Sequence, residues 1–110
     1  MRREVIVPIV LATAVLLLAI VPAGSQDRDA LTKRGEQLFV SQGCYGCHQI
    51  AKLGTPIGPD LSRVGAKYPA SYLTGWVRDP ESVRPSAHMP KLELSPEDVR
   101  ALAAYLASLK

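Results

Sequence analysis

The two cysteines constrain this 110-residue chain more than any other feature, and both lie in the run Cys44-Tyr45-Gly46-Cys47-His48. Two thiols separated by two residues and followed directly by a histidine are typical of c-type haem attachment. The spacing suits that chemistry, because each thiol can add to one vinyl group of a porphyrin while the next imidazole reaches the iron. The run therefore predicts one covalent haem c, attached through Cys44 and Cys47 and ligated by His48.

Three other kinds of site also use a pair of cysteines. A redox-active dithiol would be expected in a thioredoxin-like βαβ pattern, which this sequence lacks. A zinc site would need a second pair of ligands, and His88 is the one histidine left to contribute. A plain disulfide stays open as an interpretation, although it does not account for the histidine that follows the pair.

The size of the chain favours a bound cofactor. The part beyond residue 24 is too small to bury much apolar surface without a disulfide, a metal or a cofactor. The chain has one Trp and one Phe, so a large apolar haem would supply part of the core. The formal net charge is only +3, and no cluster of basic residues with interleaved aromatics indicates nucleic-acid binding.

The N-terminal quarter of the chain differs from the rest. Arg2 and Arg3 precede an uncharged, almost wholly apolar run from Val5 to Val21, which is the layout of a secretory signal. About 17 residues rising ~1.5 Å each span roughly 25 Å, close to the thickness of a bilayer core. Residues 1–24 are therefore expected to be a transmembrane signal anchor or, alternatively, a cleaved signal peptide. Either one places the haem domain on the exported, periplasmic or extracytoplasmic side, membrane-anchored in the first case and secreted in the second.

The remainder of the chain indicates an all-α domain. Residues 25–30 are polar and are expected to form a linker, so that the domain covers 31–110. Apolar residues at helical spacing predict helices over 31–40, 69–79 and 96–109, with a single turn near 61–65. The last helix has the clearest start, because Ser95 suits the N-cap and Pro96 the first helical position. Nothing alternates with period two, so no sheet is expected.

Together these motifs resemble class I cytochrome c. The resemblance covers the chain from about residue 29 to its end. It rests on Gly35 with Phe39, the run 44–48, Gly58-Pro59-Asp60-Leu61, Met89-Pro90, and Leu102 with Tyr105-Leu106. It implies three to four helices around one covalent haem, and one-electron transfer as the function. In that fold Gly35 would let the N- and C-terminal helices cross closely.

The resemblance also implies the surroundings of the iron. His48 would be the proximal ligand, and the carbonyl of Pro59 would accept a hydrogen bond from its imidazole. Met89 would be the distal ligand, and His/Met ligation raises the reduction potential of haem. His88 is the rival distal ligand, although the family pattern places methionine directly before proline.

Three further residues are candidates for contact with the haem. Trp76 would donate its indole N–H to a propionate or, just as plausibly, line the haem crevice together with Tyr72. Arg63 would lie near a propionate or else remain in solvent. These assignments depend on the resemblance alone.

A six-coordinate iron favours electron transfer over catalysis. The stretch from Tyr72 to Pro90 is similar to cytochrome c domains of respiratory complexes. The chain would therefore be a membrane-tethered carrier or a cytochrome c subunit of a haem-copper oxidase or bc-type complex. Its partners would be redox proteins and the membrane, with no nucleic acid and no small-molecule substrate.

Two other functions stay open. A haem-based gas sensor or peroxidatic enzyme would need a displaceable sixth ligand, with His88 as the single candidate for distal chemistry. An assembly subunit would use its haem only as a folding core. We expect no catalytic residues in this chain.

Overall fold

The computed structural model describes residues 19, 20 and 22–110. The predicted signal anchor or signal peptide falls almost entirely on residues outside this range. Within the described part of the chain, no helix is both long and apolar enough to cross a membrane.

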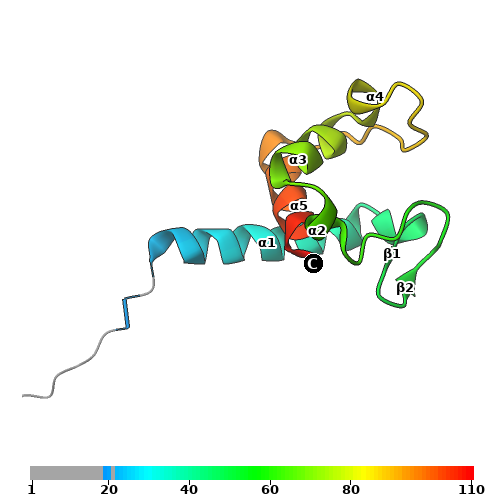
Figure 1. Ribbon diagram of the computed structural model, residues 1–110. Helices are drawn as coiled ribbons and strands as arrows, with labels where there is room; N and C mark the ends of the chain where they lie inside the picture. The colour runs from blue at the N-terminus through cyan, green and yellow to red at the C-terminus, as the bar shows by residue number, and fades with distance from the viewer. Residues whose placement is uncertain (1–18, 21) are drawn as a thin grey trace, which may run out of the picture.

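The described residues form a helical domain with one small hairpin (Figure 1). Its helices are α1 (Ala23–Ser41), α2 (Val64–Lys67), α3 (Ala70–Arg78), α4 (Pro80–Val83) and α5 (Pro96–Ser108), with a 3-10 turn η1 (Cys44–Gly46). The strands β1 (Gln49–Ile50) and β2 (Leu53–Gly54) pair antiparallel, with Gln49 opposite Gly54 and Ile50 opposite Leu53. The structure is mainly helical, which confirms the expected all-α, class I cytochrome c type of fold.

The first helix is longer than expected. Residues 25–30, expected as a polar linker, belong to α1, which begins at Ala23. From Ala23 to Leu31 the chain has no proline and no β-branched residue, and its one weak helix former, Gly24, lies in the first turn. The helix ends at Ser41, and Gly43, two residues further on, has a φ of 74°, in the left-handed region that suits glycine.

The other differences concern short elements. The expected turn near residues 61–65 is the short helix α2, which begins at Val64. The hairpin was not expected, because strands of two residues are too short to show alternation. Helix α4 was also not expected, although Pro80 occupies its first position as proline commonly does. The helices expected over 69–79 and 96–109 are present as α3 and α5 with small changes at their ends.

The crossing of α1 and α5 is the structural centre of the domain (Figure 1). A Cβ atom at Gly35 would overlap the backbone carbonyl of Ala101 and lie 2.7 Å from Cβ of Tyr105. The ring of Phe39 packs edge-on against Tyr105 with 5.8 Å between ring centroids. Burial of Tyr105 raises its pKa to about 12. The two helices therefore meet at backbone distance, as the glycine at position 35 allows.

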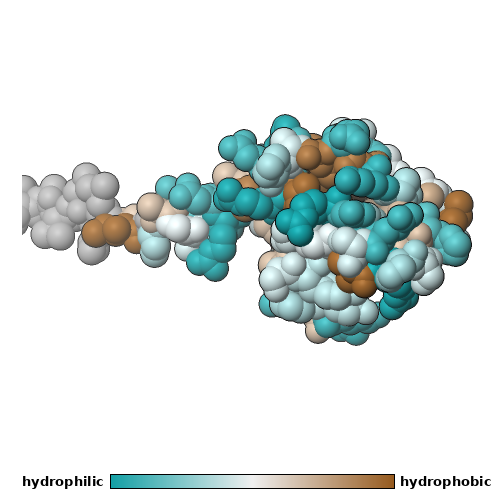
Figure 2. Space-filling view, turned by 90° about the horizontal axis from the view of Figure 1, so that it is seen from above, coloured by the Kyte–Doolittle hydropathy of each residue, from teal (hydrophilic) through white to brown (hydrophobic). Residues whose placement is uncertain are grey.

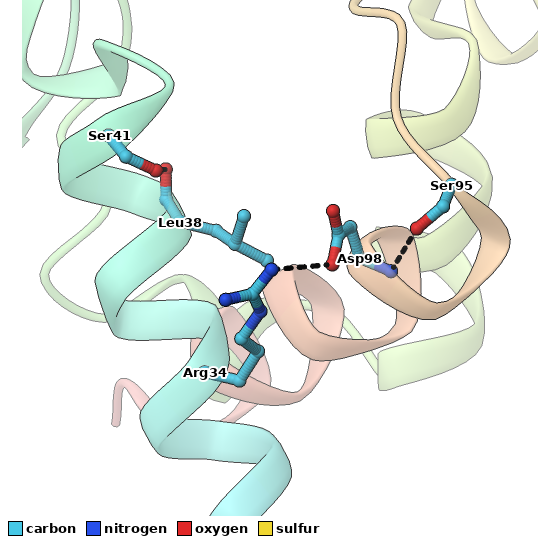
Figure 3. A network of polar contacts seen from close by, with 5 residues as sticks. All are labelled: Arg34, Leu38, Ser41, Ser95 and Asp98. Carbon is cyan, nitrogen blue, oxygen red and sulfur yellow. Dashed lines mark hydrogen bonds and ion pairs between the residues drawn. The ribbon is translucent and has the colours of Figure 1, made fainter.

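Polar contacts align the same two helices at their edge (Figure 3). The guanidinium of Arg34 lies 3.4 Å from the carboxylate of Asp98. The hydroxyl of Ser95 accepts a hydrogen bond from the Asp98 backbone N–H at 3.1 Å and caps α5. Arg34 is largely exposed, and exposed ion pairs contribute at most about 1 kcal/mol. The crossing therefore depends mainly on its apolar packing.

Replacing Gly35 with alanine is expected to lower the free energy of unfolding of the holoprotein by about 3 kcal/mol, the upper end of overpacking costs. The added methyl group cannot be accommodated without separating α1 from α5. Denaturant unfolding followed by helical circular dichroism would measure the change. Gly75→Ala is the matched control, because its Cβ would meet only Val83 at 3.7 Å. That change should leave stability within about 1 kcal/mol of wild type, and equal losses in both variants would contradict the close crossing.

Candidate functional site

A cleft opens between the helices and the long segments that join them. Its volume is about 1000 Å³ including the open mouth. Most of its lining is apolar, with side chains from α1, α2, α3, α5 and the connecting segments: Phe39, Leu61, Val64, Leu73, Val77, Leu92, Leu102 and Leu106. A cleft with mainly apolar walls suits a large flat ligand.

The attachment motif forms one wall of this cleft. Its tight turn is closed by the carbonyl of Cys44, which accepts hydrogen bonds from the backbone N–H groups of Cys47 at 3.2 Å and His48 at 3.0 Å. Cys44 lines the cleft, and burial raises the pKa of its thiol. Cys47 is exposed. The two thiols of the predicted attachment pair thus differ in environment, one within the cleft and one at the surface.

His48 lines the cleft with one ring nitrogen already engaged. Its Nδ1 lies 2.8 Å from the carbonyl oxygen of Pro59. A carbonyl can only accept, so Nδ1 carries the proton and Nε2 keeps its lone pair for a metal. Gly58 permits this contact, because a Cβ there would lie 2.7 Å from Cε1 of His48. The predicted contact between Pro59 and His48 is present in the structure.

The loop that contains Pro59 is hydrogen-bonded to the hairpin. Leu61 donates its backbone N–H to the carbonyl of Gln49 at 2.8 Å. The Ser62 hydroxyl accepts from the backbone N–H of Ala51 at 2.7 Å. The carboxylate of Asp60 accepts from the Ser62 N–H at 2.7 Å, and hydrogen bonding from the side chain and the backbone of Ser62 lowers the pKa of Asp60. The imidazole is therefore oriented by a loop that is itself held in place.

Met89 lines the same cleft as His48. The indole N–H of Trp76 donates to the Met89 sulfur, with 3.2 Å between Nε1 and Sδ. Trp76 in turn stacks on Tyr72 with ring centroids 6.4 Å apart, and Tyr72 stacks on Tyr68 at 4.4 Å. Tyr72 and Trp76 thus line the cleft, as one of the two interpretations of Trp76 predicts. The indole N–H of Trp76 is directed at Met89.

Of the two positions considered for Arg63, near a propionate or in solvent, the structure shows the exposed one. Arg63 is exposed at the N-terminal end of α2 and is not among the residues that line the cleft. Lys67 and Arg84 line it instead. Neither residue could be predicted from the sequence, because no helical face or motif relates them. His88 is exposed and is likewise not among the described residues of the lining.

The groups gathered here suit an iron porphyrin. Apolar walls cover a flat macrocycle, and an imidazole with a free Nε2 and a thioether are both established haem ligands. Cys44 lines the cleft and Cys47 follows it in the same tight turn, and Lys67 and Arg84 match the charge of carboxylate substituents. The residues present therefore fit a covalent haem.

Comparisons with known proteins agree with this chemistry. A family model described as Cytochrome c matches residues 32–110. Cytochrome c oxidase subunit 2 of Alkalihalophilus pseudofirmus is 37% identical over 94 residues, which cover 77% of this chain and 28% of that protein. The subunit 2 of Bacillus sp. (strain PS3) is 32% identical over 97 residues, 74% of this chain and 27% of the relative. The chain thus spans little more than a quarter of the length of these oxidase subunits.

A shorter relative matches almost from end to end. Cytochrome c-551 of Pseudomonas denitrificans is 31% identical over 83 residues, which cover 69% of this chain and 98% of that protein. The family match includes the attachment motif, the Pro59 loop and the segment around Met89. The chain belongs to the cytochrome c family, as a class I cytochrome c that carries covalent haem c.

Proposed function

We propose that His48 and Met89 are the two axial ligands of the haem iron and that this six-coordinate site exchanges single electrons with protein partners. The observation that supports this proposal most strongly is that both side chains line one cleft and are oriented there by neighbouring residues. Pro59 leaves Nε2 of His48 available, and Trp76 orients the sulfur of Met89. A thioether opposite an imidazole favours the reduced iron and raises the potential.

The other cleft residues have supporting roles in this proposal. Cys44 and Cys47 would hold the haem through thioethers, and the bound haem supplies a one-electron couple. Lys67 and Arg84, in place of Arg63, would pair with its propionates at the cleft mouth. The apolar walls exclude water, which keeps the dielectric environment of the iron low.

The partner in this proposal is a respiratory complex in a membrane. Two observations support it: the oxidase subunits among the relatives and the apolar run at residues 5–21. The chain would be a membrane-tethered carrier or a cytochrome c subunit of a haem-copper oxidase or bc-type complex. Its haem domain would lie on the exported side, because the positive flank at Arg2 and Arg3 stays in the cytoplasm.

Trp76→Phe is expected to lower the reduction potential by roughly 20–65 mV, the equivalent of one net hydrogen bond of about 0.5–1.5 kcal/mol. Donation to the sulfur weakens the thioether as an electron donor, and phenylalanine keeps the ring without the N–H. Spectroelectrochemical titration of the holoprotein would measure the shift. Tyr72→Phe is the matched control, since it preserves the stacking on Trp76 and should leave the potential unchanged. An unchanged potential in Trp76→Phe would contradict the role of its N–H.

The proposed ligation is tested on the full chain purified with its native membrane. Mass spectrometry should show one covalent haem and report whether the N-terminal residues are retained. Oxidised and reduced spectra should show a low-spin iron, including the long-wavelength charge-transfer band of methionine-ligated ferric haem. Rapid carbon monoxide binding by the reduced protein, without that band, would refute a closed sixth site. Co-purifying subunits would identify the complex.

A further inference from the structure

Three oxidisable aromatic rings form a row beside the cleft. The rings of Tyr68 and Tyr72 are nearly parallel, at an angle of 14° and with 4.4 Å between their centroids. Tyr72 stacks in turn on Trp76 at 20° and 6.4 Å. The indole Nε1 of Trp76 lies 3.2 Å from Sδ of Met89. The row therefore leads, ring by ring, from Tyr68 to the sulfur that we propose as an iron ligand.

The local structure fixes the order of these rings. Tyr72 and Trp76 are four positions apart on α3, so their side chains lie on the same face of that helix. Tyr68 follows α2 in extended conformation and donates its backbone N–H to the carbonyl of Val64 at 3.1 Å. This hydrogen bond holds Tyr68 at the junction of α2 and α3, where its ring covers that of Tyr72. The row is thus built into the fold at both ends.

The outer end of the row is open to solvent. Tyr68 is 41% exposed, and it is the one exposed aromatic residue in the part of the chain that the structure describes. Helices α3 and α4, at the top of Figure 1, face the viewer in Figure 2, where polar and apolar side chains are interspersed. Such a mixed surface does not exclude small polar solutes. An oxidant that reaches the protein from water therefore meets Tyr68 before the other two rings.

Ordinary electron exchange makes no use of these rings. A phenol or an indole gives up an electron much less readily than a ferrous haem does, so the row stays reduced while the haem cycles. The order is reversed once a radical oxidant has removed an electron from Tyr68, because the reduced haem then lies energetically above the tyrosyl radical. The row connects the two sites with oxidisable groups at every position.

We propose that Tyr68, Tyr72 and Trp76 form a repair relay, through which the reduced haem returns an electron to Tyr68 after a small radical oxidant has oxidised it. This activity goes beyond electron exchange with protein partners. It rests on the proposed function in one respect, the ligation of the iron by Met89. The oxidant belongs to the class of small one-electron radical oxidants, of which the carbonate radical anion is the probe used below.

Electrons and protons balance in this relay. The carbonate radical anion takes one electron from the phenol of Tyr68 and becomes carbonate, while the phenol proton passes to water. Tyr72 then reduces Tyr68, Trp76 reduces Tyr72, and Trp76 regains its electron from the ferrous haem. The Tyr68 oxygen takes a proton back from water, to which it is exposed. The net change is one carbonate radical reduced for each ferrous haem converted to ferric, with all three rings restored.

The test exposes full-length holoprotein, either fully reduced or fully oxidised, to a limiting amount of carbonate radical anion generated by radiolysis. In the ferric protein the haem has no electron to return. Radicals on Tyr68 of two molecules then couple through a carbon–carbon bond, and peptide mass spectrometry should find dimers linked at this residue. In the ferrous protein these dimers should be lost. The amount of haem oxidised should equal the amount of oxidant added.

Three variants locate the relay. Tyr72→Phe keeps the stacked ring but removes the oxidisable phenol, so the ferrous variant should form as many dimers at Tyr68 as the ferric wild type. Tyr68→Phe should lose the dimers in both redox states. Tyr105→Phe is the matched control, because it removes a phenol that is buried between α1 and α5, outside the row. This control should behave as wild type in both redox states.

Two results would overturn the relay. One is an equal yield of Tyr68 dimers from ferrous and ferric wild type, which would mean that the haem returns no electron. The other is a ferrous Tyr72→Phe variant that is protected as well as wild type, which would mean that the electron does not pass through Tyr72. The proposed function fails separately, because its charge-transfer band and the oxidation of the haem by a small inorganic oxidant are measured on the same samples before irradiation.

Discussion

Replacing both Cys44 and Cys47 with serine is expected to reduce the covalently bound haem to zero. The two thiols are the only cysteines in the chain, so no other thioether can form. Mass spectrometry of the denatured protein should show the mass of the polypeptide alone. The change should also destabilise the fold by several kcal/mol, because a domain of this size has too little apolar core to tolerate an empty cleft.

Ser41→Ala provides the control for the double cysteine variant. Ser41 is exposed at the end of α1, and its hydroxyl reaches only the carbonyl of Leu38 at 3.4 Å (Figure 3). This variant should keep its haem and its helical content. Haem that remains bound to the double serine variant after denaturation would show that attachment does not occur at these thiols.

Met89→Ala is expected to lower the reduction potential by roughly 0.2–0.3 V, within the ~0.8 V over which axial ligands set haem potentials. Alanine removes the thioether and leaves the sixth position to water or to an external ligand. The methionine charge-transfer band should disappear, and the reduced protein should bind carbon monoxide. Potentiometry and optical spectra measure all three changes on one sample.

His88→Ala distinguishes the two candidate distal ligands. His88 is exposed, whereas Met89 lines the cleft. The His88 variant should therefore retain the potential, the charge-transfer band and the closed sixth site of wild type. If His88→Ala lost them while Met89→Ala kept them, the ligand assignment would be reversed.

Several features of the fold and of the site could be predicted from the sequence, because local motifs specify them. The attachment motif specifies its cofactor by spacing, and Ser95 with Pro96 marks the start of α5 at the observed position. The Pro59 carbonyl lies where the resemblance places it, 2.8 Å from His48. Each of these features depends on a few neighbouring residues or on a compact motif.

The remaining features depend on contacts between distant segments. Trp76 and Met89 are thirteen positions apart, and their 3.2 Å contact requires the chain after α4 to return over α3. The choice of Arg84 over Arg63 at the cleft depends on the path of that same segment. No periodic pattern in the sequence predicts the path of the segment after α4. Composition does not predict the extension of α1 through residues 25–30, because polar residues occur both in linkers and in exposed helices.

The exposed N-terminal part of α1 determines how the domain is oriented relative to the residues that precede it. Residues 23–30 project from the body of the domain as continuous helix (Figure 1), and eight residues rise about 12 Å. A helix couples length to angle, so one inserted residue would turn the haem domain by about 100° relative to whatever precedes Ala23. Four inserted residues would restore the angle to within about 40° while adding about 6 Å of distance. With a flexible tether, neither insertion would change the orientation of the domain. The direction in which the haem domain faces is therefore set by the phase of this helix.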